Sequence, residues 1–359
     1  MKIEYTAEGE EVLAIDKLTL SLCMIVKDES LEWMFIENCL NNAYGEVDEI
    51  VILTDKKFEN SEKKKYLENK FNVRFIFRGW DNDFSALRNE SLKHVKCHWI
   101  LILDADEFIF KEDIKKMKQI LSLNENLNAY DAFELQQVTY NNNNMDYKWV
   151  PITNSITEKS PFKGAVVVPI IRLFKNKAGI KFKHRVHELV DEKNLRKGAL
   201  KIPIHHFKYF KGLKNVKKKE LWTLELMKVE SEENPEYPKV FFDMGLLYLN
   251  FLNDSENALK YMNKAFELEK SAEILIVIAK IYSESGNVEK AIETYKKAAD
   301  LDQKNPIIFA NIGSVYAKSE RYEEALENYI KSLDLGIQNP ELVRSWIKEI
   351  ESIMNKKID

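Results

Sequence analysis

Short hydrophobic runs separated by longer amphipathic stretches occupy the first part of the chain. The runs LTLSLCMIV, EIVILT, VRFIF and WILIL begin near residues 18, 49, 73 and 99, and the stretches between them suit helices. Near-continuous apolar runs are typical of strands that are buried on both faces. Their alternation with helical stretches predicts an α/β domain with a parallel sheet.

Polar residues follow each of these runs, at the expected carboxyl end of each strand. Ligands bind at such ends in open α/β sheets, because the loops that follow the strands converge there. The candidate residues are Lys27, Asp28 and Glu29; Thr54 and Asp55; Arg78 to Asp83; and Asp104 to Glu107.

The second part of the chain repeats itself with a period of 34 residues. The recurring positions are Ala279, Tyr282, Ala291 and Tyr295, which return as Gly313, Tyr316, Ala325 and Tyr329, and Pro306, which returns as Pro340. An earlier copy has one extra residue before the turn FLNDSEN. This period, with small residues where two helices cross, resembles the tetratricopeptide repeat, and PELVRSWIKEIESIMNKK resembles its terminal capping helix. Three repeats and a cap form a minimal stable array.

These patterns divide the chain into three segments. Residues 1–210 form the α/β domain, residues 211–237 a charged helical connector, and residues 238–359 the repeats with their capping helix. Repeat arrays bind peptides or proteins on a concave face, or serve as dimerisation surfaces. We therefore expect a polypeptide partner or a homodimer through the repeats.

Composition narrows the function classes. A hydrophobic fraction of 45% and a charged fraction of 31% are typical of soluble globular proteins, and a net charge of −4 gives no electrostatic case for nucleic acid. Cys23, Cys39 and Cys97 lie in apolar contexts without CxxC spacing, which favours a reduced, cytoplasmic chain. No run approaches the ~20 apolar residues of a transmembrane segment, and the acidic start is unlike a signal peptide.

The fourth apolar run ends on clustered acids, in HWILILDADEFIF. Ionised carboxylates are rarely buried without a partner, so a cation is expected at this strand end. Neither GxGxxG nor GxxxxGK[ST] is present to bind phosphates through glycines. Asp104 and Asp106 would share one face of a continuing strand, and could hold Mg²⁺ or Mn²⁺, which in turn neutralises a diphosphate.

Five segments in order resemble a family-2 glycosyltransferase of the GT-A fold with a tetratricopeptide tail. They are LSLCMIVKDE, GWDNDFSALRNESL, ILILDADE, IIRLFKNKAGIKFKHRVHELV and IPIHHFKYF, over roughly residues 17 to 210. The subgroup is similar to bacterial peptide or protein glycosyltransferases of the bacteriocin S-glycosyltransferase type. The resemblance implies a Rossmann-like mixed sheet followed by an all-α repeat solenoid, with DAD as the family's DXD motif.

The resemblance also implies roles for individual residues. Those directed at the nucleotide-sugar donor are Lys27, Asp28, Glu29, Asp55, Arg88, Asn89, Asp104 and Asp106. Asp106 would bind the metal, and a late histidine would complete its coordination, with His206 preferred over His205. Asp28 is equally plausible as a helix cap.

Several of these side chains have structural alternatives. Arg88 could instead bridge Asp81 or Asp83, and Glu107 could be only structural. Trp80 is expected to pack rather than to stack on sugar.

An inverting transfer needs a carboxylate to take the proton of the acceptor. We assign this role to Glu188, with Glu134 and Asp146 as alternatives. The segment HRVHELV lacks the HExxH spacing of zinc proteases.

The sequence thus predicts a metal-dependent transferase that moves a sugar, most simply from UDP, to a peptide, a protein side chain or a glycan. A polysaccharide-building enzyme, an inactive scaffold that acts through its repeats, and a nucleotidyltransferase are the alternatives.

Overall fold

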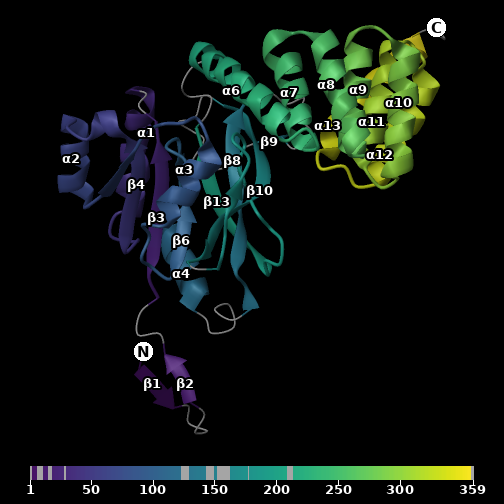
Figure 1. The fold of residues 1–359 in the computed structure, drawn as a ribbon. Helices are drawn as coiled ribbons and strands as arrows, with labels where there is room; N and C mark the ends of the chain where they lie inside the picture. Colours follow the sequence, from purple (N-terminus) through teal and green to yellow (C-terminus); the bar gives the residue numbers. More distant parts are fainter. Residues whose placement is uncertain are drawn as a thin grey trace. The chain divides into compact units, whose positions relative to one another are not determined.

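The computed structural model describes residues 2–5, 11–14, 18–27, 30–122, 129–142, 149–151, 162–176, 178–207 and 213–356 (Figure 1). The chain divides into two compact units, Met1–Val216 and Lys217–Asp359. Three predicted site residues, Asp28, Glu29 and Asp146, lie outside the described residues.

The first unit contains a large mixed sheet. Its strands are β3 (Leu20–Val26), β4 (Glu49–Asp55), β5 (Arg74–Arg78), β6 (Trp99–Ile102), β7 (Glu107–Phe108), β8 (Ala132–Asn141), β9 (Trp149–Pro151), β10 (Gly164–Lys175) and β13 (Lys197–His206). They lie in the order β5-β4-β3-β6-β10-β8-β13-β7, and β9 pairs with β10. Two smaller strand pairs are β1 (Lys2–Tyr5) with β2 (Glu11–Ala14), and β11 (Phe182–Lys183) with β12 (Leu189–Val190).

The four strands predicted from apolar runs are parallel to one another, because β3 pairs in parallel with both β4 and β6, and β4 with β5. The other half of the sheet departs from the parallel pattern. Strand β10 runs antiparallel to β6 and β8, and β7 runs antiparallel to β13. The sheet is therefore mixed, as the family resemblance implied.

Helices connect the parallel strands (Figure 1). They are α1 (Ser30–Ala43), α2 (Glu62–Phe71) and α3 (Phe84–Leu92), with a short 3₁₀ turn at Lys56–Phe58. Helix α4 (Lys111–Ser122) lies between β7 and β8 in the chain. All residues of β3 and β6 are buried. Burial of a central strand on both faces leaves its position little freedom, so the end of β6 is a fixed platform for the acids that follow it.

The second unit is helical. Helix α6 (Leu213–Glu233) crosses the boundary between the units, and the others are α7 (Pro238–Leu247), α8 (Ser255–Leu268), α9 (Ala272–Glu284), α10 (Val288–Leu301), α11 (Pro306–Lys318), α12 (Tyr322–Asp334) and α13 (Pro340–Lys356). Helices α7, α11 and α13 each begin at a proline, where the missing N–H costs nothing. Helix α7 packs against α8, α9 against α10 and α11 against α12, as the repeat pattern predicts.

The extra residue of the first repeat is absorbed within the helix pair. Residues Tyr248–Leu252 form a π-helical turn at the end of α7, and Asn253 then adopts a left-handed conformation with φ of 53°. A π turn accommodates one additional residue without ending the helix. The ring of Tyr248 stacks on that of Tyr261 with centroids 5.3 Å apart, so the two helices remain in contact across the insertion.

No helix in the described part of the chain is long and apolar enough to cross a membrane.

The small residue at the crossing of α11 and α12 generates a prediction. A Cβ atom at Gly313 would lie 2.7 Å from a ring carbon of Tyr329 and 3.1 Å from the carbonyl oxygen of Ala325. Alanine favours helices by about 1 kcal/mol over glycine, but overpacking costs roughly 1–3 kcal/mol. We expect Gly313→Ala to lower the free energy of unfolding in urea denaturation. Lys318→Ala on the exposed end of α11 is the control, with a change within about 0.5 kcal/mol, and an increase for Gly313→Ala would contradict the packing.

Candidate active site

The acidic motif does not continue the strand as expected. Strand β6 ends at Ile102, and the chain then turns, because the N–H of Glu107 donates to the carbonyl of Asp104 over 3.0 Å. The expectation that Asp104 and Asp106 share one face of an extended strand is therefore wrong. The turn gives the two acids different partners.

Asp104 lies between two buried arginines. Its Oδ1 accepts a hydrogen bond from Nη2 of Arg88, and its Oδ2 accepts one from Nη2 of Arg172 over 2.8 Å. Burial opposes the charged form, but Arg172 and Arg88 outweigh it and hold the pKa of Asp104 well below its usual range. Asp104 is therefore a fixed anion.

Arg88 bridges the acidic turn to the predicted base. Its side chain is 1% exposed, and its Nε donates to Oε1 of Glu188 over 3.1 Å. The structural partners weighed from the sequence are used elsewhere, since Asp83 caps α3 and Asp81 pairs with Arg78. Arg88 thus contacts two carboxylates of the site, and its role toward the donor stays a prediction.

Glu107 stabilises the turn through hydrogen bonds of its buried carboxylate. It is 1% exposed, its Oε2 accepts the N–H of Asp104 over 2.8 Å, and its Oε1 accepts Nε2 of Gln137 over 2.5 Å and Nη2 of Arg172 over 3.3 Å. Burial raises the pKa of Glu107, against the opposing effect of Arg172. The structural alternative for Glu107 accounts for these contacts.

The two adjacent histidines of β13 point to opposite faces of the sheet, as successive residues of a strand do. His205 stacks on Phe108 with centroids 5.1 Å apart and bonds through Nδ1 to the hydroxyl of Tyr140 over 2.5 Å. Burial lowers the pKa of His205 to about 4. His206 lies on the other face, with Nε2 3.6 Å from Oδ2 of Asp106.

Asp106 and His206 can face one divalent ion together. The Nδ1 of His206 lies 3.0 Å from the hydroxyl of Thr139, an outer contact of the kind that orients metal-binding imidazoles. Within the described residues no group of three or more His, Cys, Asp or Glu is arranged to hold a metal. The pair fits Mn²⁺ or Mg²⁺ as a partial site, in which oxygens of a bound diphosphate and water would complete the coordination.

The predicted nucleotide-side residues have local roles in the structure. Asp55 accepts the N–H of Lys57 over 3.0 Å and so caps the 3₁₀ turn. The amino group of Lys27 lies 5.9 Å from the ring centroid of Trp80. Trp80 packs edge-on against Phe84 and against a small apolar cluster, in agreement with the packing role expected for it.

Asn89 holds the segment that carries Glu188. Its Oδ1 accepts the N–H of Phe182 over 2.8 Å, and its Nδ2 donates to the carbonyl of Phe182 over 2.9 Å. The amide is thereby used on both sides to attach β11 to α3. Asn89 thus has a positioning role in the structure, and its contact with the nucleotide stays a prediction.

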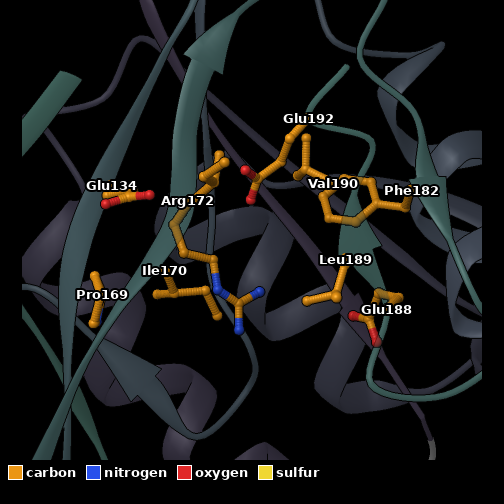
Figure 2. Close-up of a pocket in the computed structure, with 10 residues that line it drawn as sticks. Glu134, Pro169, Ile170, Arg172, Phe182, Glu188, Leu189, Val190 and Glu192 are labelled. Atoms are coloured by element: carbon orange, nitrogen blue, oxygen red, sulfur yellow. The ribbon is translucent and has the colours of Figure 1, made fainter. Parts of the chain in front are cut away.

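A small pocket opens beside these groups (Figure 2). It is lined by Glu134, Pro169, Ile170, Ile171, Arg172, Phe182, Glu188, Leu189, Val190 and Glu192. Its volume of about 110 Å³ is well below the roughly 300–1,000 Å³ of pockets for whole ligands. Figure 2 shows the guanidinium of Arg172 pointing into it and Glu188 at its side, so the pocket is one corner of the site.

We did not predict from the sequence that Arg172 and Gln137 belong to the site. An arginine within the apolar run GAVVVPIIRLF was a usable signal, because a charged residue in a buried strand requires partners. Gln137 carried no such signal, since its alternating strand context suits an exposed polar residue equally well.

Comparison with known proteins identifies the two domains. Residues 21–183 match the family described as Glycosyl transferase family 2. Residues 279–320 match the TPR repeat, and residues 238–271 and 308–335 match the tetratricopeptide repeat. The chain carries a glycosyltransferase family 2 domain followed by tetratricopeptide repeats.

Two curated relatives align with most of this chain at low identity. A TPR repeat-containing protein of Synechococcus elongatus is 26% identical over 78% of this chain and 65% of its own length. The SPbeta prophage-derived glycosyltransferase SunS of Bacillus subtilis is 24% identical over 74% of this chain and 57% of its own length. The chain thus spans less than two thirds of the length of these relatives. A crystal structure of MamA is 17% identical and covers 40% of this chain and 94% of that one, with a TM-score of 0.32.

The two hydrogen bonds between the Asn89 amide and the backbone of Phe182 lead to a prediction. Asn89→Ala removes two hydrogen bonds and leaves the backbone of Phe182 unpaired, which we expect to cost about 1–3 kcal/mol of stability. Urea denaturation measures this loss of stability. Lys93→Ala, at the exposed end of α3, is the control. Unchanged stability of Asn89→Ala would contradict the positioning role of Asn89.

Proposed function

We propose that this chain is a metal-dependent glycosyltransferase that moves a sugar from a nucleotide donor, UDP-linked, to an acceptor with inversion. The observation that carries the proposal is the pair Asp106 and His206, 3.6 Å apart just beyond the end of buried β6, in a family-2 glycosyltransferase domain. A carboxylate and an imidazole at this distance can hold one divalent ion.

The residues around this pair supply distinct functions. Asp106 and His206 would hold Mn²⁺ or Mg²⁺, which supplies charge neutralisation for a departing diphosphate. Asp104, fixed by its two arginines, would accept hydrogen bonds from the donor on its remaining lone pairs. Glu188 lines the pocket and would accept the proton of the acceptor as it attacks.

A peptide or protein side chain is the proposed acceptor class. The tetratricopeptide repeats support it, because such arrays present extended surfaces that bind polypeptides. The relative named glycosyltransferase SunS, which aligns over 74% of this chain, supports glycosyl transfer and does not bear on the acceptor. A glycan acceptor and a repeat-mediated homodimer are the alternatives. Mass spectrometry of peptides and of oligosaccharides incubated with a mixture of nucleotide sugars would decide between the acceptors.

The metal pair is tested by donor turnover. We expect the release of UDP from UDP-glucose or UDP-N-acetylglucosamine to require Mn²⁺ or Mg²⁺. Asp106→Asn should lower kcat/KM by roughly 100-fold or more, because it removes the only charged ligand of the pair. His206→Ala should raise the Mn²⁺ concentration needed for half-maximal turnover. Asp300→Asn and the exposed His98→Ala are matched controls, and wild-type turnover by Asp106→Asn would rule out this metal site.

The base is tested by separating binding from turnover. Glu188→Gln keeps the shape of the side chain but cannot accept a proton, so we expect kcat to fall by roughly 100-fold or more while UDP affinity changes little. Glu134→Gln is the comparison, because Glu134 lines the same pocket. If Glu134→Gln loses turnover and Glu188→Gln retains it, the role of the base passes to Glu134.

A further inference from the structure

Arg172 lies at an irregularity of β10. On β8, Ile171 pairs with Glu134 and Leu173 pairs with Phe133, so Arg172 is an extra residue without a partner in the ladder. Leu173 also pairs with Leu101 of β6, which places the bulge beside the end of that strand. Bulges bend a strand and re-aim a side chain, and they are common next to active sites.

The side chain of Arg172 bonds to both ends of the acidic turn, Asp104 and Glu107. A single nitrogen of Arg172, Nη2, lies 2.8 Å from Oδ2 of Asp104 and 3.3 Å from Oε1 of Glu107. The side chain is 8% exposed, and its Nε is buried without a hydrogen-bond partner among the described residues. An unsatisfied buried donor is unfavourable, and such departures from good local bonding are concentrated at functional sites.

The turn is closed by further bonds between the same ends. Oε2 of Glu107 accepts the N–H of Asp104, and the N–H of Glu107 donates to the carbonyl of Asp104. Gln137 holds the remaining oxygen of Glu107 from the neighbouring strand β8. Asp106 lies between these fixed ends, with its Oδ2 facing His206.

We propose that Arg172 is a positioning residue for the metal pair: it closes the Asp104–Glu107 turn and so directs Asp106 at His206. This inference rests on the proposed function. Arg172 itself contacts neither member of the pair through any bond described above. It acts on the metal through the geometry of the turn, as outer contacts do in other metal sites.

Charge and geometry make opposite predictions here. If Arg172 acted only as a positive charge near the site, its removal would leave the site more negative and strengthen the binding of a divalent cation. If it acts by positioning, its removal loosens the turn and weakens the binding of the cation. Loss of a residue that orients a metal ligand typically lowers metal affinity by about 10- to 100-fold. The sign of the change therefore separates the two.

The experiment measures Mn²⁺ binding directly, by electron paramagnetic resonance of the free ion with saturating UDP, without any turnover. Arg172→Met removes both the charge and the bonds, whereas Arg172→Lys keeps the charge but not the planar fork. We expect both variants to weaken Mn²⁺ binding by about 10-fold or more. Arg196→Met, which removes an exposed arginine bonded to Asp131, is the matched control and should bind as the wild type does.

A second arm tests whether Arg172 acts through the turn. Glu107→Gln should weaken Mn²⁺ binding as well, and the double variant should lose no more than the stronger single variant, because the two residues share one contact. Thermal melting identifies the folded fraction of every variant, and binding is compared for that fraction.

The outcomes are distinct. Mn²⁺ binding by Arg172→Met that equals or exceeds that of the wild type, with a lower melting temperature, would overturn the inference and leave the metal pair in place. Additive losses in the double variant would also overturn it. Absence of Mn²⁺ binding by the wild type would overturn the metal assignment of the proposed function and this inference with it.

Discussion

The ion pairs of Asp104 with Arg88 and Arg172 are the interaction on which the site depends. They join helix α3, the turn after β6 and strand β10, which are distant in sequence. Removing charges from water is costly, and the cost is offset only when each charge has well-placed partners. Here the same two arginines also hold Glu188 and Glu107, so the position of each acid depends on the others. The site is one connected unit rather than a set of separate residues.

Strand β13 supplies the other fixed side of the site. His205 and the following Phe207 pack into an aromatic cluster with Phe108 and Tyr140, with centroid distances between 5.1 and 5.9 Å. This packing sets the register of the strand, and the period of two then leaves His206 on the opposite face. A buried, neutral histidine thus determines where its neighbour points.

Much of the fold follows from the sequence, and less of the site does. The parallel strands and the helix pairs were predictable because burial on both faces and a 34-residue period leave strong patterns. The antiparallel half left no comparable pattern, and β7 has only two residues. The sequence also indicated that the acids following β6 belong to the site, because charged residues directly follow a buried apolar run. The roles of Asn89 and Gln137 were not, since each depends on a partner at least 30 residues away and an amide side chain suits many positions.

The attachment of β11 has a consequence for how such a domain can diversify. Strand β11 pairs with β12 over two residues and is held to α3 by the Asn89 amide, and the N–H of Phe84 donates to the carbonyl of Arg185 in the loop that follows β11. These bonds are made to backbone atoms, which every amino acid provides. The exposed Leu189 of this hairpin can therefore be exchanged while these bonds persist, whereas Glu188 is held by its ion pair with Arg88 and Val186 is buried. A substitution at Leu189 changes the wall of the pocket and leaves the backbone bonds that hold the hairpin in place.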